Sequence, residues 1–301
     1  MNLLITGAWQ NAAAHIPQLR EMGHAVEFLQ YEKDPLPCGY AWVEGVVCNG
    51  LFLHHPIEKF ENLQYIQLTS AGLDRVPMDY ITSHGIGIRN ARGVYSAPMA
   101  EYALAGVLQL YKRLDFFREN QKQHAWQKHR GLTELGGKHV CILGCGSVGT
   151  ECARRFSAFG CRVVGVDITT APGEYFDEMH LPRELGGVLP SVDVLVLTIP
   201  LTEQTRHLID AGKLKRMKPG AVLVNISRGP VVDTEALTEE LRAGHLGGAV
   251  LDVFEEEPLG ADSPLWDLEN VIITPHVSFA GDRNQERLMN VIVNNLKIWR
   301  K

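Results

Sequence analysis

Three glycines in the stretch CILGCGSVGTECA, residues 141–153, have the spacing G-x-G-x-x-G. The spacing alone is a weak signal in a chain with 29 glycines, but here an apolar run precedes it and a helical pattern follows it. In that setting Gly144 permits a sharp turn, Gly146 lets a pyrophosphate approach the backbone, and Gly149 lets helix and strand pack closely. Ser147–Val148 would begin the helix, whose first N–H groups attract anions. The stretch therefore predicts a dinucleotide site rather than a turn that binds nothing.

An acidic residue ends the next apolar run, Arg162–Val166. Asp167 follows Gly149 by 18 residues, the arrangement expected of a carboxylate that accepts hydrogen bonds from the ribose hydroxyls of NAD. The same carboxylate would repel the 2′-phosphate of NADP. The sequence therefore favours NAD as the cofactor and disfavours NADP.

Apolar runs alternate with helical patterns along the chain, which predicts an α/β protein. Runs without polar alternation are typical of parallel strands that are covered on both faces. In the first part of the chain we expect strands at Leu3–Thr6, Ala25–Leu29, Gly45–Cys48, Tyr65–Leu68 and Ile86–Arg89. In the later part we expect them at Val140–Leu143, Arg162–Val166, Val194–Thr198, Ala221–Ile226, Gly248–Leu251 and Val271–Ile273.

Four further segments have patterns that bear on the organisation of the chain. A helix is expected at Ala12–Met22, ending at a glycine. The segment Ala97–Arg118 predicts one helix that is apolar around most of its circumference and is buried on more than one side. The polar segment Glu119–Arg130 with its single tryptophan is either a surface excursion or an oligomer arm, and Asp282–Lys301 predicts a helix returning across the molecule.

Composition and charge are those of an ordinary globular protein of 301 residues, long enough for two domains. The net charge of −6 gives no general attraction for nucleic acid, and no apolar run is as long as a membrane helix requires. The six cysteines are too sparse for a disulfide scaffold and contain no C-x-x-C pair, and Cys141 and Cys145 span a strand and a turn, which does not favour a zinc site. We expect reduced thiols, a cytoplasmic protein, and no bound metal, nucleic acid or membrane.

Three later segments carry residue types suited to chemistry, namely NISRGPVVD (225–233), LDVFEEEP (251–258) and TPHVS (274–278). With SAGLD (70–74), NARGVYSAPMAEYAL (90–104), LGGKHVCILGCGSVG (135–149) and TIPLTEQT (198–205), they resemble the motifs of the D-isomer-specific 2-hydroxyacid dehydrogenase family, in the same order. This family includes phosphoglycerate dehydrogenases and glyoxylate/hydroxypyruvate reductases, and the resemblance extends over nearly the whole chain.

The resemblance implies two Rossmann-like, doubly wound parallel-sheet domains, with the cofactor domain inserted into a flavodoxin-like substrate domain. The substrate (catalytic) domain would be discontinuous, residues 1–90 and 277–301. The NAD-binding Rossmann domain would span residues 91–276. Such an insertion explains why the glycine stretch begins only near the middle of the chain.

The resemblance also assigns three catalytic residues. Arg228 would hold the substrate carboxylate, which suits a guanidinium because its planar fork donates two parallel hydrogen bonds and keeps its charge. His276 would be the general acid–base, since imidazole can take up or return a proton near neutral pH. Glu257, the carboxylate before the proline, would orient that imidazole and stabilise its protonated form, while Glu255 and Glu256 are expected to face solvent.

Other matched residues would bind substrate or cofactor. The substrate loop would be Ser70, Ala71 and Gly72, whose backbone amides meet the carboxylate together with Arg228 and His276. Pro200, Thr205 and Asp252 would contact the cofactor. Each has a structural alternative, because Pro200 could end a strand, Thr205 could be an ordinary loop residue, and Asp252 could cap a strand end.

The sequence therefore predicts an NAD-dependent enzyme that transfers a hydride between the nicotinamide and C2 of a small D-2-hydroxy acid or 2-keto acid. Phosphoglycerate, glyoxylate or hydroxypyruvate, and lactate-type acids are all compatible, and a homodimer is expected. The alternative is an NAD(H)-sensing binding protein of the C-terminal binding protein type, with little catalytic role. Four side chains have open roles: Arg75, Arg89 and Arg92 could bind a phosphate or be surface charge, and Phe279 could narrow the substrate mouth or pack between domains.

Overall fold

The computed structural model describes residues 1–171 and 173–299. The chain divides into two compact units, here called the terminal unit (Met1–Tyr95 with Gly281–Lys301) and the central unit (Ser96–Ala280). These boundaries lie five and four residues later than the domain limits expected at 90/91 and 276/277. Residues 300 and 301, the end of the helix expected at Asp282–Lys301, lie outside the described part.

The terminal unit is built on a five-stranded parallel sheet with the order β2-β1-β3-β4-β5. The strands are β1 (Asn2–Thr6), β2 (Ala25–Leu29), β3 (Gly45–Cys48), β4 (Tyr65–Leu68) and β5 (Gly87–Arg89). All five predicted strands are confirmed to within one residue at either end, because each is a short run of β-forming apolar residues. The order is that of flavodoxin-like sheets, as the family resemblance implies.

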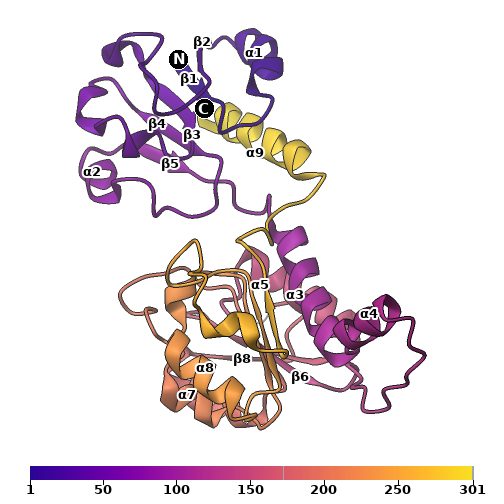
Figure 1. Ribbon diagram of the computed structural model, residues 1–301. Helices are drawn as coiled ribbons and strands as arrows, with labels where there is room; N and C mark the ends of the chain where they lie inside the picture. The colour runs from indigo at the N-terminus through magenta and orange to yellow at the C-terminus, as the bar shows by residue number, and fades with distance from the viewer. Residues whose placement is uncertain (172, 300–301) are drawn as a thin grey trace. The chain divides into compact units, whose positions relative to one another are not determined.

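Helices cover both faces of this sheet (Figure 1). One face carries α1 (Ala12–Glu21) and α9 (Asn284–Trp299), whose Leu288, Ile292 and Leu296 are buried against the strands. The other face carries α2 (Met78–Ser83) and irregular segments around it. Short 3-10 turns lie at Tyr40–Trp42, Leu51–Leu53 and Ile57–Lys59. The C-terminal helix is therefore part of the same compact unit as the first strand.

The central unit is built on a seven-stranded parallel sheet with the order β12-β11-β10-β9-β6-β7-β8. The strands are β6 (His139–Leu143), β7 (Arg162–Val166), β8 (Glu178–His180), β9 (Val194–Leu197), β10 (Val222–Asn225), β11 (Gly248–Leu251) and β12 (Val271–Ile273). The direction of strand addition reverses between β6 and β9. In open parallel sheets, ligands bind beyond the carboxyl ends of the strands at such a reversal.

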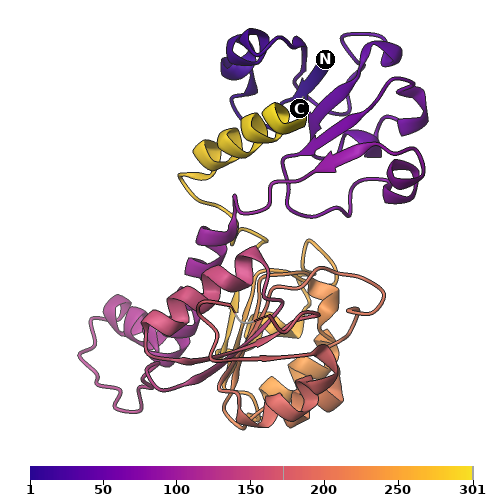
Figure 2. The ribbon, with the colours of Figure 1, turned by 180° about the vertical axis from the view of Figure 1, so that it is seen from behind.

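The two faces of this sheet are covered by different helices (Figures 1 and 2). α3 (Ser96–Tyr111) and α5 (Ser147–Ala158) pack on one face. α6 (Leu185–Val188), α7 (Ala211–Arg216) and α8 (Thr234–Arg242) pack on the other. α4 (Leu114–Lys122) follows α3, and 3-10 turns lie at Pro182–Glu184, Leu189–Ser191, Gly229–Val231 and Pro264–Asp267. Both faces are thus covered, which explains the apolar strand sequences.

Two features of the central unit differ from the sequence prediction. The single helix expected at Ala97–Arg118 is wrong: α3 ends at Tyr111, and α4 begins after Arg113, whose φ of 48° is left-handed. No glycine or proline marks this break, so the sequence pattern continues through it. Strand β8 was not expected, because three residues with the sequence EMH are too few and too polar to stand out.

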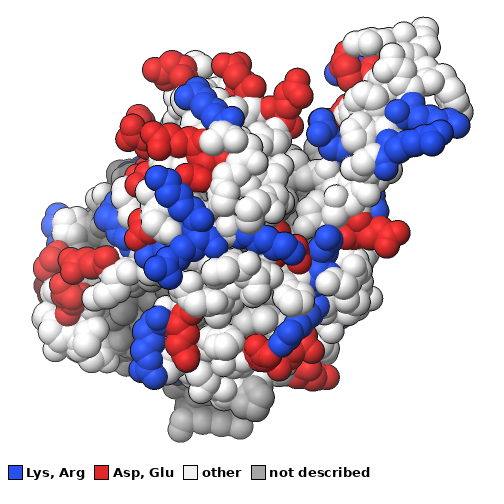
Figure 3. Space-filling view, turned by 90° about the horizontal axis from the view of Figure 1, so that it is seen from below, with Lys and Arg blue, Asp and Glu red and all other residues white. Residues whose placement is uncertain are grey.

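Surface charge is mixed, as the composition suggests. On the face drawn in Figure 3, Lys and Arg side chains are interspersed with Asp and Glu side chains. Among the described residues, no helix is long and apolar enough to cross a membrane.

Candidate active site

The glycine loop joins β6 to α5 at the reversal point of the central sheet. Gly144 has a left-handed φ of +97°, and a Cβ on it would come within 2.9 Å of the Thr198 carbonyl carbon. A Cβ on Gly149 would lie 2.0 Å from the Gly144 carbonyl oxygen. A Cβ on Gly146 would meet no atom within 4 Å. Two glycines are therefore required by packing, whereas Gly146 borders open space at the start of α5.

Asp167 closes this loop from the end of β7. Its Oδ2 accepts a hydrogen bond from the Cys145 N–H at 2.6 Å, which ties the carboxylate to the turn. Burial raises the pKa of the Cys145 thiol to about 12, and the charge of Asp167 adds to the rise. The thiol therefore stays protonated at neutral pH and places no negative charge beside an incoming phosphate.

Ser147 and Val148 form the first turn of α5 and are partly exposed. The Ser147 hydroxyl bonds to the Ser96 hydroxyl at 2.8 Å, which links the start of α5 to the start of α3. Because the first N–H groups of a helix have no partner within it, this end of α5 can bind an anion.

Pro200 and Thr205 lie in one loop after β9. The Thr205 Oγ1 donates to the Pro200 carbonyl at 2.8 Å and accepts from the Thr202 N–H at 2.7 Å. Pro200 is exposed and Thr205 is partly exposed. Thr205 therefore holds the loop in shape, and the exposed Pro200 leaves a surface that a ligand can contact.

Arg228 follows β10 and begins a short turn. Its Nη1 donates to the Ser227 carbonyl at 2.8 Å, and the Arg228 carbonyl accepts from the Asn225 side chain at 3.0 Å. Asn225 also accepts hydrogen bonds from the Ser227 N–H and hydroxyl. This buried amide was not singled out in the sequence, although it begins the NISRGPVVD segment. It fixes the turn from which the guanidinium extends.

The turn after Arg228 has no room for a side chain at Gly229. A Cβ there would lie 1.8 Å from the Phe254 carbonyl carbon. We expect Gly229→Ala to lower the free energy of unfolding by about 2 kcal/mol, because backbone must move to relieve the overlap. Denaturant unfolding measures this change.

Gly146→Ala is the matched comparison for Gly229→Ala. Its Cβ would enter open space, so we expect a loss of less than about 1 kcal/mol in stability. NADH affinity should instead fall about tenfold, since the methyl group occupies the surface that a pyrophosphate approaches. Equal losses of stability in the two variants would contradict this interpretation.

Glu257 and His276 lie against each other at the carboxyl ends of β11 and β12. The His276 Nδ1 is 2.8 Å from the Glu257 Oε2, while the Glu257 Oε1 accepts from the Phe254 N–H at 3.0 Å. The two side chains are 39% and 38% exposed, so the pair is open to a ligand. His276 has a left-handed φ of 53°, a conformation that costs free energy in any residue except glycine. The orientation of the His276 imidazole is thus set by the backbone conformation of His276 and by the contact of its ring with Glu257.

Asp252 anchors the segment that carries His276. It is fully buried, and its carboxylate accepts from the Thr274 hydroxyl at 2.6 Å and from the N–H groups of Val277 and Ser278 at 2.8 Å each. Its carbonyl accepts from the His276 N–H at 2.8 Å. These hydrogen bonds are what the structural alternative for Asp252, the cap of a strand end, requires. Contact between Asp252 and the nicotinamide stays a prediction.

A second histidine–glutamate pair was missed in the sequence. The His207 Nε2 is 2.8 Å from the Glu255 Oε2, and the Glu255 Oε1 accepts from the Thr234 N–H at 3.0 Å. Burial alone would raise the pKa of Glu255, but its hydrogen bonds with His207 and Thr234 outweigh that effect and lower it. Glu255 is exposed, as expected, but it also pairs with His207. The sequence feature that could have indicated this pair is His207, at the end of the TIPLTEQTRH segment and 48 residues before Glu255.

The residues expected in the substrate loop lie in the terminal unit, after β4. The Ser70 hydroxyl donates to the Gly72 carbonyl at 3.1 Å, and the Asn90 side chain donates to the Ala71 carbonyl at 2.7 Å. The Ser70 carbonyl accepts from the Ala91 N–H at 2.9 Å. The loop is therefore held by the segment that follows β5. The remaining predicted site residues all lie in the central unit.

Comparisons with known proteins identify the family of this chain. Residues 104–278 match the model of the D-isomer specific 2-hydroxyacid dehydrogenase, NAD binding domain. A glyoxylate reductase of Thermofilum pendens is 34% identical over 248 residues, which are 78% of this chain and 71% of that protein. An (S)-sulfolactate dehydrogenase of Chromohalobacter salexigens is 34% identical over 243 residues, 80% of this chain and 79% of that protein.

A solved structure is similar over almost the full length. The D-isomer specific 2-hydroxyacid dehydrogenase family protein of Aeromonas salmonicida is 33% identical, with a TM-score of 0.81. The match covers 99% of this chain and 95% of that one.

Proposed function

Because the chain belongs to the D-isomer specific 2-hydroxyacid dehydrogenase family and is an oxidoreductase of that class, we propose which of its residues perform the reaction. The reaction is hydride transfer between a nicotinamide cofactor and C2 of a small D-2-hydroxy acid or 2-keto acid. The observation that carries the proposal is the 2.8 Å contact between the His276 Nδ1 and the Glu257 Oε2. It lies at the carboxyl ends of parallel strands, where such sheets bind their ligands.

In the proposed mechanism His276 is the general acid–base. With Nδ1 engaged by Glu257, the Nε2 is the nitrogen that can donate a proton to the substrate oxygen during reduction and accept it during oxidation. The carboxylate of Glu257 stabilises the protonated imidazole, which is the form needed for reduction. Asp252 holds the backbone around His276 and so acts as a positioning residue.

Arg228 is the proposed carboxylate-binding residue. Its turn is fixed by Asn225 and by the close packing of Gly229 on the Phe254 backbone, which supports a rigid placement of the guanidinium. A guanidinium binds a carboxylate through two parallel hydrogen bonds, and this fixes the orientation of C2. We propose that the backbone of Ser70–Gly72 also contacts the substrate.

The glycine loop fits a dinucleotide. Gly146 borders open space at the start of α5, and the carboxylate of Asp167 closes the loop. We propose that the pyrophosphate is held by the glycine loop, residues Gly144, Gly146, Ser147, Val148 and Gly149. The Asp167 carboxylate accepts hydrogen bonds from the ribose hydroxyls. Other parts of the cofactor contact Pro200, Thr205 and Asp252. When bound, NAD supplies the hydride acceptor and NADH the hydride. NAD is the proposed preference over NADP because Asp167 is a carboxylate.

Glu257→Gln should shift the pH–rate profile and lower turnover without loss of NADH binding. Glutamine carries no charge and stabilises a protonated imidazole less well than a carboxylate does, so proton donation to the substrate oxygen should slow. Steady-state rates of keto-acid reduction across the pH range measure this, with NADH binding by fluorescence as the control. An unchanged profile would remove Glu257 from the mechanism.

The test of the function is a panel of 2-keto acids offered with NADH and with NADPH. Glyoxylate, hydroxypyruvate, pyruvate and their phosphorylated or sulfonated analogues cover the proposed substrate class. We expect reduction of at least one of them, and a higher kcat/KM with NADH than with NADPH. Tight NADH binding without reduction of any keto acid would instead favour the nucleotide-sensing role.

We further propose that the protein is a homodimer in the cytoplasm. Trp126 is 94% exposed, in the segment after α4 that the sequence marks as a possible arm. A hollow of about 640 Å³ lies among residues 117–130 and would suit a partner's side chains. The six cysteines are free thiols, which supports a reducing compartment. Sedimentation of the protein and of a Trp126→Ala variant tests the dimer.

A further inference from the structure

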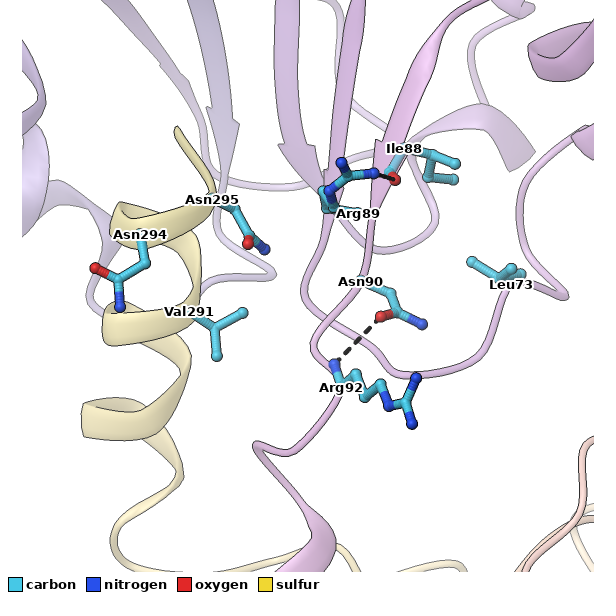
Figure 4. A pocket seen from close by; sticks show the side chains of 8 residues that line it. All are labelled: Leu73, Ile88, Arg89, Asn90, Arg92, Val291, Asn294 and Asn295. Atoms are coloured by element: carbon cyan, nitrogen blue, oxygen red, sulfur yellow. Dashed lines mark hydrogen bonds between the residues drawn. The ribbon is translucent and has the colours of Figure 1, made fainter. Parts of the chain in front are cut away.

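A cavity of about 510 Å³ lies within the terminal unit, beside the edge strand β5. Figure 4 shows Arg89, Asn90 and Arg92 on one side of it and Val291 of α9 on the other. Leu73, which follows the predicted substrate loop, also lines it. The size is typical of pockets for small molecules. The sequence left the roles of Arg89 and Arg92 open, and the structure places both in the lining of this cavity.

The lining of the cavity is cationic. It contains two arginines and three asparagines, and none of its residues is acidic. Among the described residues neither Arg89 nor Arg92 has an ion pair, and the Arg89 Nη1 donates only to the Ile88 carbonyl at 3.0 Å. Arg75, the third arginine with an open role, is not among the lining residues. Arg89 and Arg92 therefore line the cavity, whereas Arg75 does not.

One wall of the cavity is held rigidly by a buried amide. The Asn295 Nδ2 donates to the Gln67 Oε1 at 2.9 Å, and Gln67 is fully buried beneath it. The Asn295 side chain is thus fixed in place on α9. The opposite wall carries both guanidinium groups on flexible stems, which can turn toward a ligand.

The cavity wall is also the support of the substrate loop. The Asn90 side chain donates to the Ala71 carbonyl at 2.7 Å and accepts from the Arg92 N–H at 3.3 Å. The Ala91 N–H donates to the Ser70 carbonyl at 2.9 Å. A ligand that draws in Arg89 and Arg92 would therefore act on the backbone that holds Ser70 and Ala71.

We propose that this cavity binds a small oxyanion, such as a phosphate, sulfonate or carboxylate group, through Arg89 and Arg92. Planar guanidinium groups bind the oxygens of such anions bidentately, and the amide side chains can donate further hydrogen bonds. The volume leaves room for an organic part next to the apolar side chains of Leu73 and Val291. The anion is either the distal group of the substrate or a free anion that acts on the substrate loop. Only the first of these sources rests on the proposed function.

Calorimetric titration of the full chain with inorganic phosphate, with NADH present and ionic strength held constant, tests the site. We expect saturable binding that Arg89→Gln and Arg92→Gln each weaken about tenfold, since each removes a charge-assisted hydrogen bond. The double variant should not bind. Arg75→Gln should bind as the unaltered protein does, because Arg75 does not line the cavity. Failure of the unaltered protein to bind phosphate, or equal binding by the double variant, overturns the proposal.

Kinetics with two 2-keto acids then distinguish the sources of the anion. If the anion is the distal group of the substrate, Arg92→Gln raises KM for sulfopyruvate but not for pyruvate, and phosphate competes with sulfopyruvate. If it is a free anion, phosphate binds equally with the keto acid site saturated and changes KM for both acids. Because phosphate titration needs no turnover, a chain that reduces no keto acid refutes the proposed function without deciding the anion site.

Discussion

Replacing His276 by asparagine is expected to lower kcat/KM for the preferred 2-keto acid by roughly 10²–10⁴-fold, the usual contribution of a general acid–base. Asparagine is the appropriate replacement because it tolerates the left-handed backbone found at this position, where φ is 53°. The fold should therefore persist while the proton donor is lost. Steady-state reduction rates measure the effect, and NADH affinity should change by no more than about twofold, since His276 is not one of the residues proposed to hold the cofactor.

His207→Asn is the matched control for His276→Asn. His207 also has a left-handed φ, 47°, and its ring also lies 2.8 Å from a glutamate oxygen. The two side chains are similarly exposed, at 44% and 39%. His207→Asn therefore also breaks a half-exposed histidine–glutamate pair, but it leaves the proposed acid–base, His276, in place. Its kcat/KM should stay within about fivefold of the unaltered protein, since such pairs contribute little stability. Comparable losses in both variants would mean that His276 has only a structural role.

Arg228→Gln should raise KM for 2-keto acids and lower kcat/KM by roughly 10²–10³-fold, because a carboxylate would lose both hydrogen bonds and the opposing charge. The kcat/KM of Arg228→Lys should lie between that of the unaltered protein and that of Arg228→Gln, since lysine keeps the charge and loses the planar fork. The turn should keep its shape in both variants. Asn225 bonds to the Arg228 backbone carbonyl, which both variants keep, and Gly229 is unchanged.

Two comparisons make the Arg228 prediction specific. A 2-keto amide has no carboxylate, so Arg228→Gln should reduce its turnover far less than that of the corresponding acid. Arg242→Gln removes an exposed arginine from the last turn of α8 and should leave kinetics unchanged. An equal loss for acid and amide would assign Arg228 to the structure of the turn instead of to carboxylate binding.

Most of the strands could be predicted because their signal is local. Each predicted run, such as Arg162–Val166 or Gly248–Leu251, is a short apolar segment bounded by polar or glycine residues, and both occur as expected. The break between α3 and α4 could not be predicted, since helical residues continue through Arg113. Strand β8 exists because β7 offers it a partner, a property of the sheet and not of the segment EMH.

The sequence by itself determined the α/β class, the order of the strands along the chain, the glycine loop and the candidate residues Arg228, Glu257 and His276. The class, the strand order and the glycine loop follow from contiguous residues, because apolar runs specify strands and a close backbone approach such as that of Gly149 to Gly144 admits only glycine. Arg228, Glu257 and His276 are candidates because their segments resemble the motifs of the family. Tertiary structure alone decided which side chains meet. The Glu257–His276 pair spans 19 residues and the His207–Glu255 pair 48. Asp252 likewise reaches 26 residues along the chain to the Ser278 N–H. Such contacts depend on how parallel strands bring the ends of distant segments to one edge of a sheet, and no local pattern encodes that distance.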